Sequence, residues 1–176
     1  MISCVSTQSI SHMKTHSKLF QLSSCIFSAL LISLSSAAWS HGNVTPQAVD
    51  TSTLPTLGEA WKEANPYSGN AEAIKVGTSA FNQNCARCHG LEAISGGIAP
   101  DLRKLDNECA TLKIAKKQTQ CVKEVDAYFV SRFRHGVTRN GAVYMPPFEG
   151  MLNQEAAWAI KSYLETRREK PLASSK

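Results

Sequence analysis

The stretch Cys85-Ala86-Arg87-Cys88-His89 carries the most specific signal in this sequence. Two cysteines that lie three positions apart, followed at once by a histidine, form the c-type haem attachment motif. At the end of a helix, the two thiols can reach the two vinyl groups of one haem, and the histidine then lies under the iron. We therefore predict one covalently bound haem c, attached to Cys85 and Cys88, with His89 as an axial ligand.

Two other kinds of site use paired cysteines, and neither agrees with the rest of the chain. A thioredoxin-like redox motif occurs near a βαβ unit, and this sequence predicts no such unit. Half of a zinc site needs a second pair of ligands at short spacing, which Cys109 and Cys121 do not provide. Haem attachment is thus the favoured interpretation of the motif.

Residues 1–40 have the order of segments that is typical of a secretory signal peptide. A basic lead-in precedes an apolar run over 25–34, and small residues follow it. The run is shorter than the roughly 20 residues that span a bilayer, although a membrane anchor is the alternative. Cleavage before Trp39 or, as we prefer, before His41 would release the chain into the periplasm, and Met13 is an alternative start.

Composition and charge bound what the mature chain can be. With 176 residues, 43% of them hydrophobic and 19% charged, the chain has the size and composition of one globular domain. Its formal net charge of +5 is small and evenly spread, which argues against nucleic-acid binding. We expect an irregular arm over 41–71, a folded domain over 72–170 and a disordered tail over 171–176, with no stable insertion in a membrane.

Cys109 and Cys121 lie outside both the signal peptide and the haem motif. Export places them in an oxidising compartment, so we expect a disulfide between them, with two free thiols as the alternative. In the chain-entropy model, a closed loop of this size contributes about 3 kcal/mol to stability.

The apolar spacing predicts an all-α domain with three main helices and no strand. The helices are expected over 71–84, over 122–135 and from residue 153 or 154 to about 168. Gly77 costs the first helix about 1 kcal/mol relative to alanine, which makes sense if another helix crosses closely there. In the arm we expect one helical turn around 59–61.

The second iron ligand is expected from a methionine. Met145 stands before Pro146 and Pro147, whose fixed backbone can present the thioether on a stiff loop. Met151 directly precedes the last helix, where a core position is more natural. His135 is a third candidate, which we interpret as a surface histidine at a helix end. We therefore predict Met145, and a His/Met pair raises the reduction potential, as suits an electron carrier.

Pro100 and Leu102 are the remaining site residues of the prediction. The backbone carbonyl of Pro100 can accept the Nδ1–H of His89 and so fix the ring, although the proline could simply turn the loop. Leu102 is expected to form part of the wall of the haem pocket.

Between Gly77 and Leu164 the chain resembles the class I cytochromes c. The matching pieces are Gly77-x3-Phe81, the haem motif at 85–89, Ala99-Pro100-Asp101-Leu102, Met145-Pro146-Pro147-Phe148 and residues 158–164. The resemblance implies the class I cytochrome c fold over 72–170, with the first and last helices crossing so that Gly77 and Phe81 pack on Tyr163. It also implies that the carbonyl of Pro100 binds the haem histidine, His89, and that Met145 is the second iron ligand. Both assignments agree with the interpretation of the residues above.

A narrower resemblance extends over nearly all of the mature chain. Residues 65–70, residues 91–102 and the segment around Cys109 and Cys121 are similar to the soluble periplasmic cytochromes c associated with quinoprotein (PQQ-dependent) alcohol dehydrogenases. This resemblance implies a one-electron carrier, not an enzyme, that accepts electrons from alcohol oxidation by such a dehydrogenase and passes them to a terminal oxidase or another cytochrome. Two alternatives are a fixed haem subunit of a dehydrogenase complex, and a haem enzyme or gas sensor with an open distal site.

Overall fold

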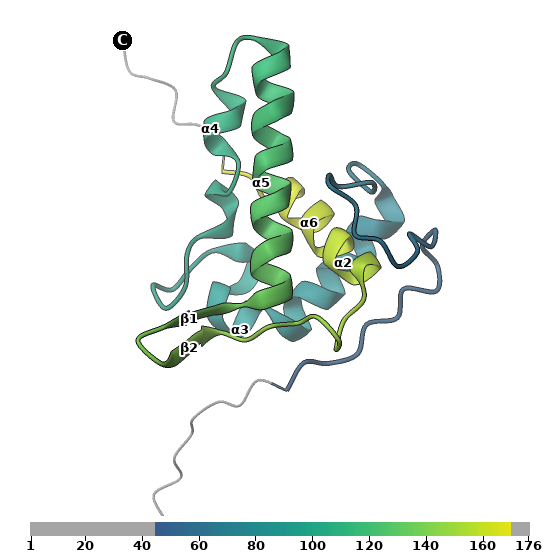
Figure 1. Cartoon of the computed structure of the whole chain (residues 1–176), viewed down its shortest axis with the longest axis vertical. Helices are drawn as coiled ribbons and strands as arrows, with labels where there is room; N and C mark the ends of the chain where they lie inside the picture. Colours follow the sequence, from purple (N-terminus) through teal and green to yellow (C-terminus); the bar gives the residue numbers. More distant parts are fainter. Residues whose placement is uncertain (1–44, 170–176) are drawn as a thin grey trace, which may run out of the picture. The chain divides into compact units, whose positions relative to one another are not determined.

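Helices are the main regular structure in the part of the chain that the computed structural model describes, residues 45–169. In chain order the elements are α2 (Ala71–Asn84), α3 (Ala86–His89), η1 (Leu91–Ala93), η2 (Leu102–Lys104), α4 (Asn107–Ala110), α5 (Ala115–His135), β1 (Val137–Arg139), β2 (Ala142–Met145) and α6 (Gln154–Thr166) (Figure 1). The prediction of a helical domain is confirmed, with one small hairpin in addition. None of the described helices is long and apolar enough to cross a membrane. The predicted signal peptide and the predicted C-terminal tail lie outside the described residues.

The three predicted main helices are present, with different bounds at some ends. α2 has the predicted range, whereas α5 begins at Ala115 instead of residue 122, and α6 ends at Thr166 instead of about residue 168. The extra turns of α5 carry lysine and glutamine, which favour a helix but give no apolar spacing that could reveal it. The expectation of a helical turn around 59–61 is wrong, because this segment contains a bend and no helix.

The hairpin of β1 and β2 is the part of the fold that the sequence analysis did not predict. The two strands pair antiparallel through a turn at Asn140 and Gly141, which both have positive φ, 50° and 77°. Asn-Gly is a pair that favours such tight hairpin turns. The strands are short and mostly exposed, so they lack the alternating apolar pattern that identifies a strand. The expectation of no strand is therefore wrong, and Met145 lies at the end of β2.

α2 and α6 cross in direct backbone contact, as expected around Gly77. A Cβ atom at Gly77 would overlap the backbone carbonyl of Ala159, so only glycine permits this approach. One turn further along α2, the fully buried Phe81 meets Tyr163, with ring centroids 5.2 Å apart. The crossing holds α2 against α6 about two turns before α2 ends at Asn84, where the haem motif begins.

The N-terminal arm, residues 45–70, covers the polar side of α6, so that α6 is buried on all sides. Side chains of α6 satisfy the irregular backbone of the arm. The carboxylate of Glu155 accepts the N–H of Leu57 at 2.7 Å, and the amide of Gln154 donates to carbonyls in the bend at 58–60. These bonds hold the segment as a bend in place of the expected helical turn.

A buried ion network joins the arm, α5 and α6. The ammonium of Lys161, whose side chain is 1% exposed, lies 3.0 Å from a carboxylate oxygen of Asp126 on α5 and 3.0 Å from one of Glu165. The other oxygen of Asp126 accepts the backbone N–H of Asn65 at 2.9 Å, and the side-chain amide of Asn65 donates to Glu165 at 3.0 Å. Opposite charges and hydrogen bonds thus offset the cost of removing these groups from water.

The network lowers the pKa of Glu165. Burial alone would raise the pKa of this carboxyl, but the charge of Lys161 and the hydrogen bonds from Asn65 and Ser68 outweigh burial. The resulting contribution to stability is complete above the ordinary pKa of a glutamate, and it is lost as the pH falls through the lowered value.

A disulfide between Cys109 and Cys121 ties α4 to α5, which confirms the predicted pairing. Cys109 is buried, 2% exposed, whereas all residues over 111–120 are exposed. The disulfide therefore fixes a segment that packing on the core does not hold.

Replacing Gly77 with alanine tests the helix crossing. We expect Gly77→Ala to reduce the free energy of unfolding by about 3 kcal/mol, because the added methyl group forces α2 and α6 apart. Urea unfolding of the haem-loaded protein, followed by circular dichroism, measures the change. Gly96→Ala is the matched control, since a methyl group at Gly96 meets no atom within 4 Å. Equal unfolding midpoints for the two variants would contradict the crossing described above.

Replacing Lys161 with methionine tests the buried network. Lys161→Met should cost about 3–5 kcal/mol, because Asp126 and Glu165 then remain buried without their cation. The loss should shrink as the pH falls, since protonation of Glu165 removes one of the uncompensated charges. Thermal unfolding at several pH values measures both effects, with Lys75→Met, at an 80% exposed lysine, as the control. Identical melting of the two variants at neutral pH would show that the network does not stabilise the fold.

Candidate haem site

Cys85 follows the last residue of α2, and the single turn of α3 carries the rest of the motif. The N–H of Cys85 donates to the carbonyl of Phe81 at 2.8 Å. The carbonyl of Cys85 in turn accepts the N–H groups of Cys88 and His89, at 3.1 and 3.0 Å. This tight turn gathers both cysteines and the histidine within a short stretch of backbone. Cys85 and Cys88 are both half-buried, and no disulfide joins them.

The thiol of Cys85 differs from that of a catalytic redox cysteine. Burial, together with the neighbouring Cys88, raises the pKa of the Cys85 thiol to about 12. Reactive CxxC motifs require the opposite, a lowered pKa that produces the thiolate near neutral pH. The structure therefore argues against the thioredoxin-like interpretation of the motif.

His89 is oriented by the backbone of the loop that follows it. Its Nδ1 lies 3.0 Å from the carbonyl oxygen of Pro100, the contact that the sequence predicts. Because a carbonyl only accepts hydrogen bonds, Nδ1 carries the proton, and Nε2 keeps its lone pair for a metal. Burial lowers the pKa of His89 more than the bond to Pro100 raises it, so the ring is neutral at pH 7, the form that ligates iron.

The two methionines that could supply the second ligand lie in different environments. Met145 is half-buried and packs against the main hydrophobic cluster, which includes Phe133 and Phe148. Met151 is 51% exposed, so the core position expected for it is wrong. The next residue, Leu152, takes that position and is 6% exposed. Met145 is thus the methionine that contacts the apolar interior.

His135 lies at the surface, as predicted. Its Nδ1 is 3.1 Å from the carbonyl oxygen of Ser131, its Nε2 is 3.8 Å from Glu149, and its side chain is 62% exposed. Both ring nitrogens therefore have neighbours at the surface, which disfavours His135 as an alternative to Met145.

Partly buried apolar side chains from the arm, the haem motif, η2, α5 and β2 pack against the main hydrophobic cluster. We call this set the apolar face, and its members are Val49, Trp61, Cys85, Ala86, Leu102, Phe129 and Met145. An apolar wall with two thiols, an imidazole nitrogen and a thioether sulfur is a donor set that suits haem c. The sequence placed Leu102 at this wall, but it did not place Trp61 there. The signal available for Trp61 was a large aromatic residue in a segment without regular secondary structure.

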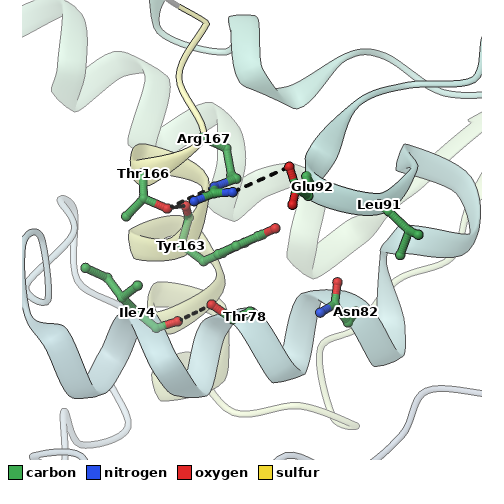
Figure 2. Close-up of a pocket in the computed structure, with 8 residues that line it drawn as sticks. All are labelled: Ile74, Thr78, Asn82, Leu91, Glu92, Tyr163, Thr166 and Arg167. Carbon is green, nitrogen blue, oxygen red and sulfur yellow. Dashed lines mark hydrogen bonds and ion pairs between the residues drawn. The ribbon is translucent and has the colours of Figure 1, made fainter.

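A separate depression of about 330 Å³ lies beside α2 and the end of α6 and contains none of the motif residues (Figure 2). At its edge, Glu92 and Arg167 form an ion pair at 3.7 Å, and Arg167 also lies over the ring of Tyr163. The hydroxyls of Thr78 and Thr166 donate to carbonyls of their own helices at 2.7 Å. Several of its polar groups are thus already engaged, and we assign no ligand to it.

Comparison with known proteins gives this geometry a family. A family model described as "Cytochrome C oxidase, cbb3-type, subunit III" matches residues 72–164. Cytochrome c550 of Pseudomonas aeruginosa is 50% identical to the chain over 139 residues, which are 77% of this chain and 86% of that protein. The chain belongs to the cytochrome c family.

Two further relatives share a shorter or weaker similarity with this cytochrome c. Quinohemoprotein alcohol dehydrogenase ADH-IIG of Pseudomonas putida is 44% identical over 41 residues, 23% of this chain and 6% of that protein. Quinohemoprotein alcohol dehydrogenase ADH IIB of the same organism is 26% identical over 113 residues, 64% of this chain and 14% of that protein. No solved structure matches the chain. As a cytochrome c, the protein binds haem c covalently and transfers electrons, and it is not an enzyme.

The two methionines can be compared directly in the haem-loaded protein. We expect Met145→Ala to abolish the methionine-to-iron charge-transfer band and to lower the reduction potential, since it removes the thioether ligand. Met151→Ala should leave both unchanged, because Met151 is exposed. Visible spectroscopy and potentiometry measure the difference. A normal charge-transfer band in Met145→Ala would exclude Met145 as a ligand.

Proposed function

We propose that Cys85 and Cys88 attach the haem, and that His89 and Met145 are its axial ligands. The observation that carries this assignment is the contact of His89 Nδ1 with Pro100, since it leaves Nε2 free for the iron. Met145 supports it as the half-buried methionine on the same apolar face as Cys85. Bound haem supplies an iron that changes between the ferrous and ferric states.

We further propose that the protein is a diffusible one-electron carrier in the periplasm. With His89 and Met145 as its ligands, the iron would have no position left for a substrate. The apolar face keeps water away from the haem, and the carbonyl of Pro100 keeps the imidazole in one orientation. The predicted signal peptide over 1–40 supports the periplasmic location. A carrier of this type turns over through small, short-lived interfaces.

As the electron donor we propose a quinoprotein alcohol dehydrogenase, and as the acceptor a terminal oxidase or another cytochrome. The similarity to two quinohemoprotein alcohol dehydrogenases supports the donor. The family model that matches the chain is described as an oxidase subunit, which supports a terminal oxidase as the acceptor. In this proposal, the protein carries electrons from alcohol oxidation to respiration.

Reduction of the ferric protein by a purified quinoprotein alcohol dehydrogenase and its alcohol tests the proposed donor. We expect the spectrum of the reduced haem to appear rapidly, in proportion to the alcohol consumed, and not with heat-inactivated enzyme. No reduction of a sample that dithionite reduces normally would exclude this donor and leave the haem assignment intact. Stable co-elution of the two proteins on gel filtration would indicate a fixed haem subunit in place of a diffusible carrier.

A further inference from the structure

The segment 108–120, here named the basic knob, consists of the end of α4, the link to α5 and the first turns of α5. All of its residues except Cys109 are exposed, including the apolar side chains of Leu112 and Ile114, at 36% and 56%. The disulfide from Cys109 to Cys121 closes the segment. The chain therefore uses a covalent bond to fix the shape of a surface that contributes little to the core.

The positive charges of the basic knob lack partners within the described part of the chain. Lys113, Lys116 and Lys117 form no ion pair there, whereas Lys104 and Lys123 each pair with a glutamate. Lys116 and Lys117 also lie in the first turn of α5, which has neither an acidic residue nor a side-chain cap. Positive charge at this end opposes the helix dipole, so the arrangement costs stability. An exposed arrangement that costs stability indicates a use outside the fold.

We propose that the basic knob docks on an acidic face of a redox partner protein, an inference that rests on the proposed diffusible-carrier function. Three lysines against one acid, Glu108, make the basic knob complementary to a negatively charged surface. Leu112 and Ile114 supply the apolar centre that protein interfaces have inside a polar rim. The disulfide holds the segment in one shape, which reduces the entropy lost on binding.

The basic knob lies at the opposite end of α5 from the haem site (Figure 1). α5 has 21 residues, and at about 1.5 Å per residue its two ends lie roughly 30 Å apart. Near its C-terminal end, Phe133 packs in the cluster that Cys85 and Met145 share. The basic knob therefore steers and holds the partner without contacting the haem. Removing the charge of the basic knob should therefore slow association with the partner, and the reduction potential of the haem should stay the same.

The double variant Lys116→Glu/Lys117→Glu tests this proposal in the haem-loaded protein. Stopped-flow spectroscopy measures the second-order rate constants for reduction by a quinoprotein alcohol dehydrogenase and for oxidation by membranes that contain the terminal oxidase. We expect at least one of the two rate constants to fall about ten-fold at low ionic strength, with a smaller loss at high salt. The reduction potential should stay the same. The melting temperature should stay the same or rise, because glutamate suits the N-terminal turn of α5.

The control variant Lys62→Glu/Lys75→Glu reverses two exposed lysines outside the basic knob and should change neither rate constant by a comparable factor. Unaltered rate constants for Lys116→Glu/Lys117→Glu in both reactions would overturn the proposal. If the dehydrogenase fails to reduce even the unaltered protein, the proposed donor is wrong, and oxidation by the membranes still decides the role of the basic knob.

Flotation with phosphatidylglycerol vesicles separates a protein partner from a lipid surface. We expect the unaltered protein and Lys116→Glu/Lys117→Glu to stay equally unbound. Vesicle binding that only the unaltered protein shows would assign the basic knob to anionic lipid and would overturn docking on a protein.

Discussion

The contact between the backbones of α2 and α6 is the constraint on which the rest of the structure depends. Gly77 lets the carbonyl of Ala159 approach, and this approach holds α2 in place against α6. Cys85 caps the end of α2, so the haem motif takes its position from a packing contact about two turns earlier. The rings of Phe81 and Tyr163 hold the same two helices together beside the motif. The position of the site therefore depends on a residue that has no side chain.

The polar face of α6 is buried because the N-terminal arm packs over it. A face that carries lysine, serine and glutamate would ordinarily point to solvent. Here the arm supplies hydrogen bonds, and Asp126 supplies the charge opposite Lys161. Moving the arm would remove the hydrogen bonds of Asn65 to groups on α5 and α6, and losing partners for buried charges carries a large penalty. The network thus favours a single placement of the arm over α6.

Features that are local in the sequence could be predicted, whereas among the contacts between distant segments only the crossing of α2 and α6 was expected, because the family resemblance implied it. The haem motif is contiguous, and the loop that brings Pro100 to His89 is short. By contrast, Asn65 binds Ser162 across 97 residues, and no spacing rule connects an irregular arm to the polar face of a late helix. The hairpin and the first turns of α5 escaped prediction for another reason: their residues are exposed, so apolar periodicity is absent.

The last helix of the described chain completes the packing of its first segments. Leu57 binds Glu155, which lies 98 residues later, and Gly77 rests on Ala159 in the same helix. Contacts of such high contact order form slowly. Whether the chain leaves a ribosome or crosses a membrane, the arm and α2 emerge early and must wait for α6. The contacts that α6 makes with the arm and with α2 can therefore form only once the last helix of the described chain is available.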